Sequence, residues 1–171
     1  MISRFAARVI FTCFAKIHLH GADRSRRKGA FILAANHISH FDPPLISIAL
    51  ERKLDWMAMA ELFESKLFAI WARAIDTFPT NRFKVDRASV KTAISRLKQE
   101  HVVGIFPEGG LRDGNRSVLG GAPMLGGIGT IAHLGAAPIV PCVILGSDRL
   151  YNVKALRPFR SRCRPCQARP L

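Results

Sequence analysis

Seven residues, NHISHFD at 36–42, place two histidines and an aspartate directly after the apolar run AFILAA at 30–35. A neutral imidazole can take a proton from a hydroxyl, and a carboxylate on its other ring nitrogen fixes the tautomer and stabilises the imidazolium. His37 and Asp42 stand five residues apart, so a turn into a helix can bring their side chains together. The pattern predicts His37 as a general base and Asp42 as its orienting partner.

Two other uses of these residues stay open. Asp42 stands immediately before Pro43, so its carboxylate could serve only as a helix N-cap. His37, His40 and Asp42 together could also hold a metal ion, but the sequence shows no further ligand for it. No metal is therefore predicted.

A second polar cluster, FPEGGLR, follows the apolar run that begins at Val102. The paired glycines, Gly109 and Gly110, would let the backbone approach a ligand and turn amide N–H groups toward an anion. Arg112 could add a charge-assisted contact to a phosphate, and Glu108 could orient a substrate hydroxyl or brace an arginine. The alternative is a glycine-rich turn beside a solvated arginine.

The elements that must position these clusters follow from the hydrophobic pattern. Short apolar, β-branched runs alternate with segments of helical spacing, and strands that are apolar throughout are typical of a sheet covered on both faces. We predict strands at 30–35, 54–60, 76–79, 102–106 and 138–146, and helices at 43–50, 61–73, 88–100 and 130–134. The fold class is therefore α/β, with a mainly parallel central sheet flanked by helices. Both clusters should lie beyond the carboxyl ends of strands, where such sheets bind ligands.

The N-terminal residues 1–21 predict an amphipathic helix that precedes one domain, residues 22–171. The longest uncharged run, seven residues at 9–15, is far shorter than the about 20 residues that span a bilayer. A polar stripe recurs every four residues and carries three cations, so the helix could lie among anionic lipid headgroups with its apolar side buried. The stripe consists of Arg4, Arg8, Thr12 and Lys16. The alternative is an amphipathic helix that packs on the domain.

Charge and cysteine content narrow the choice of partners. The chain has 26 Lys and Arg residues against 12 Asp and Glu, a net charge of +14, which favours anionic partners. Aromatic residues lie in apolar runs rather than among the cations, so a membrane surface or a phosphate ligand ranks above nucleic acid. The CRPC segment at 163–166 lacks a second cysteine pair, and nothing predicts a disulfide framework, which favours a reducing cytosolic compartment.

Four segments in this order resemble the conserved blocks of the glycerolipid acyltransferases, which include the 1-acylglycerol-3-phosphate acyltransferases. They are NHISHFD at 36–42, FPTNR at 78–82, FPEG at 106–109 and IVP at 139–141, and the resemblance covers about residues 18–151. It implies that a fatty acyl group passes from acyl-CoA or acyl carrier protein to a hydroxyl of a lysophospholipid such as lysophosphatidic acid. The hydroxyl would attack the thioester directly, with no acyl-enzyme and no metal or redox cofactor.

The same resemblance implies roles for individual residues. His37 is the base and Asp42 its partner, while Arg82, Glu108 and Gly109 form the acceptor's phosphate site. We count Asn36, Gly110 and Arg112 with the substrate-binding residues, although this arginine stands one position later than in the family's Glu-Gly-Thr-Arg. The basic, proline-rich stretch after Tyr151 departs from the family pattern, which predicts a truncated or altered C-terminus.

These observations predict an acyltransferase peripherally bound at the cytoplasmic face of a membrane. Its partners would be anionic lipid, an acyl-donor thioester and a lysophospholipid acceptor. The alternative is a non-catalytic peripheral lipid-binding protein. A serine hydrolase is a third reading, but the sequence lacks the Gly-x-Ser-x-Gly nucleophile motif.

Overall fold

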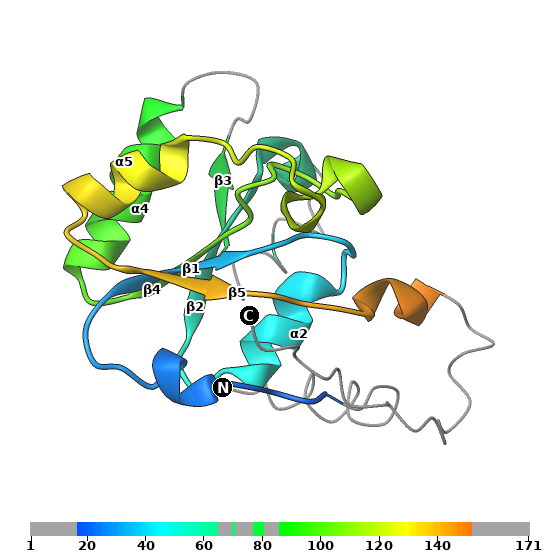
Figure 1. Ribbon diagram of the computed structural model, residues 1–171. Coiled ribbons are helices and arrows are strands. Elements are labelled where there is room, and N and C mark those ends of the chain that lie inside the picture. The colour runs from blue at the N-terminus through cyan, green and yellow to red at the C-terminus, as the bar shows by residue number, and fades with distance from the viewer. Residues whose placement is uncertain (1–16, 65–69, 71–76, 81–85, 152–171) are drawn as a thin grey trace.

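The centre of the fold is a five-stranded sheet in the order β3-β2-β4-β1-β5 (Figure 1). The structure, a computed structural model, describes residues 17–64, 70, 77–80 and 86–151. Every pairing in the sheet is parallel. The strands are β1 (Phe31–Ala35), β2 (Leu54–Met59), β3 (Phe78–Thr80), β4 (Val102–Ile105) and β5 (Ile139–Cys142). The predicted α/β class with a parallel central sheet is confirmed.

Helices cover both faces of the sheet. Helix α2 (Asp42–Ala49) lies on one face, and α4 (Arg87–Lys98) and α5 (Gly127–Leu134) lie on the other (Figure 1). Strand β1, which lies between β4 and β5, divides its side chains between the two cores, because successive residues of a strand point to opposite faces. Phe31 and Leu33 join the core that contains Ile46 of α2, and Ile32 joins the core that contains Leu97 of α4. The uninterrupted apolar run of β1 therefore reflects burial on both sides.

Among the described residues, five short 3-10 helices precede, connect or follow these elements. Two of them, η3 and η4, lie in the long loop after β4, and η5 follows β5. Both of these segments continue from the carboxyl ends of their strands, where the candidate site forms. The bounds are η1 (Ala22–Ser25), η2 (Ala60–Phe63), η3 (Gly114–Arg116), η4 (Val118–Gly120) and η5 (Ser147–Tyr151).

One predicted strand is shorter than expected, and one predicted helix lies mostly outside the described residues. The strand expected at 138–146 ends at Cys142, because the backbone of Ile144 pairs with a side chain, that of Asn36, instead of continuing the ladder. The helix expected at 61–73 begins as the 3-10 turn η2, and most of its remaining residues lie outside the described part of the chain.

The N-terminal helix predicted for 1–21 is wrong for its last turn, since residues 17–20 are not helical. Residues 1–16, which carry the rest of that prediction, lie outside the described residues. Arg82 and the CRPC segment lie outside them as well. Within the part of the chain that the structure describes, no helix is both long enough and apolar enough to cross a membrane.

Candidate active site

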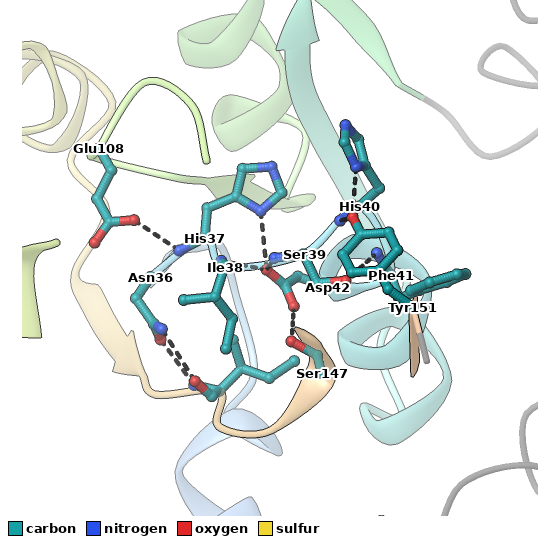
Figure 2. A network of polar contacts seen from close by, with 11 residues as sticks. Asn36, His37, Ile38, Ser39, His40, Phe41, Asp42, Glu108, Ser147 and Tyr151 are labelled. Atoms are coloured by element: carbon teal, nitrogen blue, oxygen red, sulfur yellow. Dashed lines mark hydrogen bonds and ion pairs between the residues drawn. The ribbon is translucent and has the colours of Figure 1, made fainter. Parts of the chain in front are cut away.

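The two polar clusters meet beyond the carboxyl ends of β1 and β4, and the backbone of His37 joins them. Its N–H donates to Oε2 of Glu108 at 2.8 Å, across 71 residues of sequence (Figure 2). Its carbonyl accepts from the N–H of Arg112 at 2.8 Å. β1 and β4 are neighbours in the sheet, so the turns that follow them are adjacent as well. The expectation that both clusters share one edge is confirmed for the residues named here.

The side chains of His37 and Asp42 form a hydrogen-bonded pair. Nδ1 of His37 lies 2.9 Å from Oδ2 of Asp42. An ionised carboxylate can only accept a hydrogen bond, so Nδ1 carries the proton and Nε2 of the neutral ring has a free lone pair. The aspartate side chain is fully buried, and the histidine side chain is 15 % exposed. No described residue bonds to Nε2, which leaves that nitrogen for a substrate proton.

Asp42 is held as a carboxylate by four donors. Oδ2 also accepts the backbone N–H groups of Ile38 and Ser39, each at 2.8 Å, and Oδ1 accepts the hydroxyl of Ser147. Burial alone raises the pKa of this carboxyl. The hydrogen bonds from His37, Ser147 and the two amides outweigh it, so the pKa of Asp42 lies below its ordinary value.

The alternative reading of Asp42 as a helix N-cap is wrong. Asp42 is the first residue of α2, Phe41 is the N-cap, and no side chain caps this helix end. The carboxylate instead accepts the N–H groups of residues that precede the helix, which closes the turn at 38–42. The same contacts that shape this turn also aim the carboxylate at His37.

A stack of three rings fixes the plane of the imidazole. The ring of His37 lies on Phe106, with centroids 4.0 Å apart and planes at 16°. Phe106 lies in turn on Trp56 of β2, at 4.8 Å and 9°. A hydrogen bond holds the indole of Trp56 in place, since its Nε1–H donates to Oγ of Ser47 at 2.8 Å. Because the indole is buried, it transmits a fixed orientation through Phe106 to His37.

Asn36 and Glu108, predicted to bind substrate, are both engaged by the protein itself. The amide nitrogen of Asn36 donates to the carbonyl of Ile144 at 3.0 Å, and its oxygen accepts the N–H of Ile144 at 2.8 Å. Glu108 uses its second oxygen, Oε1, to accept the N–H of Val118 at 2.8 Å. These contacts give both side chains a scaffolding role, and their contact with substrate stays a prediction.

The glycine-rich turn is only partly arranged as predicted. The N–H of Gly109 donates to the carbonyl of Phe106 at 3.0 Å, so this amide closes the turn instead of facing an anion. Its φ of 67° explains why glycine stands there. The side chain of Arg112 is exposed and has no hydrogen bond to another described residue. It remains available for an anion, as does the backbone at Gly110.

His40 does not join the pair. Its backbone N–H and its Nδ1 both bond to the hydroxyl of Tyr151, and the ring of Tyr151 also packs against Phe41. Figure 2 shows the imidazoles of His37 and His40 pointing to different partners. The three side chains considered for a metal therefore do not converge, and no group of metal-ligating residues occurs among the residues described.

Residues that the sequence reading missed complete the site. Trp56 sets the ring stack, Ser147 bonds to Asp42, and Tyr151 bonds to His40. The last two lie four residues apart in η5, more than 100 residues from their partners. The rule that ligand sites form beyond the carboxyl ends of parallel strands points to the segment after β5 and could have found them.

An apolar cavity of about 200 Å³ lies beside this site. Its walls come from the N-terminal residues 17–19, from α2 and from the segment after β5, and they include Ile144 and Ser147. Both of these residues contact the 36–42 turn directly. An apolar ligand in the cavity would therefore lie next to the residues that support the His37–Asp42 pair.

Comparisons with known proteins agree with this arrangement. A family model described as "Acyltransferase" matches residues 16–145. The chain is 29% identical over 142 residues to the 1-acyl-sn-glycerol-3-phosphate acyltransferase of Bacillus subtilis, covering 82% of this chain and 68% of that protein. It is 29% identical over 132 residues to the protein of the same name from Streptococcus pneumoniae, covering 75% of this chain and 47% of that one.

A solved structure shares the fold. The 1-acyl-sn-glycerophosphate (LPA) acyltransferase of Thermotoga maritima superposes with a TM-score of 0.66 at 23% identity. The superposition covers 86% of this chain and 57% of the other. The chain thus spans about half to two thirds of the length of the relatives that it matches.

Proposed function

Because the chain belongs to the acyltransferase family, we propose that it transfers a fatty acyl group from a thioester donor to a hydroxyl of a lysophosphatidic acid-like acceptor. The contact between Nδ1 of His37 and Oδ2 of Asp42 carries the proposal, because it leaves a basic Nε2 at the carboxyl edge of the sheet. The two bacterial relatives, both 1-acyl-sn-glycerol-3-phosphate acyltransferases by name, support the choice of acceptor.

In the proposed reaction His37 acts as a general base. Its Nε2 removes the proton of the acceptor hydroxyl while the oxygen attacks the carbonyl carbon of the thioester. Asp42 stabilises the imidazolium that forms, because its carboxylate stays bonded to Nδ1–H. The tetrahedral intermediate then loses the thiolate, which takes the proton from the imidazolium. An ester bond replaces the thioester bond, and no atom changes oxidation state, so the step requires no redox group.

Several features support where the substrates would bind. The apolar cavity beside Ser147 suits part of an acyl chain, since apolar walls gain free energy by covering such a chain. Arg112, exposed and close in sequence to the Glu108 turn, suits the acceptor phosphate, and Arg82 is proposed for the same role. The net charge of +14 favours both a phosphorylated acceptor and the phosphate-bearing donors acyl-CoA and acyl carrier protein.

We also propose that the protein works as a peripheral protein at the cytoplasmic face of a membrane. Its cationic, partly apolar N-terminal sequence suits anionic lipid headgroups, and its acceptor resides in the membrane. In this proposal residues 1–21 associate with the lipid and residues 22–171 carry the chemistry.

The test is a transfer assay with purified protein, acyl-CoA and lysophosphatidate in mixed micelles. The free thiol released from the donor is measured with a colorimetric thiol reagent, and the diacyl product is identified by mass spectrometry. His37→Ala should abolish acyl transfer without loss of vesicle binding. The control is His133→Ala, a change at an exposed histidine of α5, which should leave both transfer and vesicle binding intact. A parent protein that binds vesicles but transfers no acyl group would instead favour the non-catalytic lipid-binding alternative.

A further inference from the structure

Ser147, the first residue of η5, reaches Asp42 from the side opposite His37 (Figure 2). Its hydroxyl is the donor, because the carboxylate can only accept. Ser147 is 4 % exposed, so water does not compete freely for this contact. The bond joins residues that are 105 positions apart in the chain.

The two carboxylate oxygens of Asp42 accept different numbers of hydrogen bonds. Oδ2 accepts three hydrogen bonds, from Nδ1 of His37 and from the N–H groups of Ile38 and Ser39. Oδ1 accepts the hydroxyl of Ser147 and no other donor among the described residues. Ser147 therefore holds the second oxygen, and with the three bonds to Oδ2 it restrains the rotation of the carboxylate about its Cβ–Cγ bond. That rotation decides whether Oδ2 lies in the plane and direction of Nδ1–H.

The segment that carries Ser147 is itself fastened to the same turn on both sides. Before it, the backbone of Ile144 makes two hydrogen bonds with the side chain of Asn36. After it, the hydroxyl of Tyr151 bonds to His40. Ser147 is thus held at a fixed position relative to the 36–42 turn, which is what a residue that orients another side chain requires.

We infer that Ser147 is a positioning residue for acyl transfer: it sets the rotation of the Asp42 carboxylate so that Oδ2 orients the imidazole of His37. The inference rests on the proposed function, in which His37 is the base. It adds a residue outside the two polar clusters, from a part of the chain beyond the family match at 16–145. The hydroxyl of Ser147 bonds to Asp42 and not to His37, so its proposed effect on the base passes through Asp42.

The kinetic test compares Ser147→Ala with Ser147→Thr. Loss of one hydrogen bond to a buried carboxylate should lower kcat about tenfold or more, with KM for both substrates within about twofold, because the bond that is lost joins Ser147 to Asp42. Threonine keeps a hydroxyl at the same place and should restore at least part of kcat. A second readout needs no turnover: the pKa of Asp42, followed by carboxyl ¹³C NMR, should rise in Ser147→Ala.

Ser89 offers a matched control. It is also buried, and its hydroxyl also donates to an aspartate, Asp86, which is the N-cap of α4 and is not part of the 36–42 turn. Ser89→Ala should lower stability by a similar amount yet leave kcat and the pKa of Asp42 unchanged. This separates the orientation of Asp42 from a general loss of packing.

The outcomes distinguish the inference from the function on which it rests. If His37→Ala abolishes transfer but Ser147→Ala matches Ser89→Ala in kcat and in the pKa of Asp42, the positioning role is overturned alone. If His37→Ala retains transfer, the proposed function fails and the positioning role fails with it. A low kcat with unchanged KM, partial rescue by threonine and a raised pKa of Asp42 together support the inference.

Discussion

Gly104 of β4 lies opposite Trp56 of β2 in the sheet, and the indole occupies the space where a side chain at position 104 would begin. A Cβ added at Gly104 would lie 2.6 Å from Cε3 of Trp56. The glycine therefore admits the ring that supports Phe106 and, through it, His37. The absence of a Cβ at Gly104 thus makes room for the ring stack that orients the proposed base.

We predict that Gly104→Ala lowers the free energy of unfolding by about 1–3 kcal/mol, the usual cost of overpacking a core. It should also lower kcat, because the displaced indole shifts the ring stack. Urea unfolding and steady-state kinetics measure the two effects. Gly126→Ala is the control, since a Cβ there meets nothing within 4 Å. Equal behaviour of the two variants would show that Trp56 does not govern His37.

Asp42→Asn should lower kcat by about 10³- to 10⁴-fold, the loss expected when the orienting carboxylate of such a pair becomes an amide. Vesicle binding should change far less. Comparable losses of turnover and lipid binding would mark Asp42 as a structural residue only.

The same variant tests the pH dependence of stability. The pKa of Asp42 is lower in the folded protein than its ordinary value of 3.8, so the ionised form stabilises the fold above that pH. This contribution falls as the pH drops below 3.8 through the folded-state pKa. The difference in unfolding free energy between the parent and Asp42→Asn should therefore shrink in that acidic range. A difference that stays constant there would contradict the lowered pKa.

Glu108→Gln should lower kcat more than it raises KM for the acceptor. The carboxylate accepts the N–H groups of His37 and Val118, and an amide can satisfy only one of them through its oxygen. The buried donor left over costs about 1–3 kcal/mol of stability. Glu61→Gln, at an exposed position in η2, is the control. A pure rise in KM would instead assign Glu108 to acceptor binding.

Arg112→Ala should raise KM for lysophosphatidate about tenfold and leave kcat nearly unchanged, as loss of one charge-assisted contact would. The effect should weaken at high salt. Arg116→Ala is matched to it, because Arg116 is also exposed but already pairs with Asp113. If both variants raise KM alike, the cause is overall charge rather than a defined phosphate contact.

A buried acid that points to the opposite face of β2 from Trp56 should affect stability more than catalysis. Asp55 of β2 is 1 % exposed and bonds to His101 at 2.7 Å and Arg96 at 3.3 Å. Both partners of Asp55 are partly exposed, so the cost of Asp55→Ala should fall below the about 3–5 kcal/mol typical of a fully buried pair. Thermal unfolding measures the loss. The kcat of the remaining folded enzyme should equal that of the parent.

The layered fold and the His37–Asp42 pair could be predicted from sequence because their signals are local. An apolar run as short as β1 implies a strand buried on both faces, and a five-residue spacing brings an imidazole to a carboxylate across a turn. The position of both clusters at one edge followed from the general rule for parallel sheets.

The residues that hold His37 and Asp42 in place could not be predicted in the same way. Trp56, Ser147 and Tyr151 reach the site only through the order of strands, which places segments distant in sequence side by side. Nothing in the spacing of Asn36 or Glu108 reveals that their polar atoms bond to backbone groups of Ile144 and Val118. Sequence identified these side chains as polar groups near the chemistry, and only their geometry shows what they hold.

The position of β1 between β4 and β5 also determines when this strand can pair during synthesis of the chain. Its neighbours are β4 and β5, so the first strand that can pair with it emerges about 70 residues later. Translation proceeds at about 5–20 residues per second, so synthesis of those residues takes at least several seconds. During this time the apolar segment 31–35 has no partner strand. His37 and Asp42, which are proposed to carry the reaction, are thus translated early. Asp42 can form its hydrogen bond with Ser147 only after residue 147 has left the ribosome. A ribosome-bound chaperone would meet an unpaired hydrophobic strand throughout that interval.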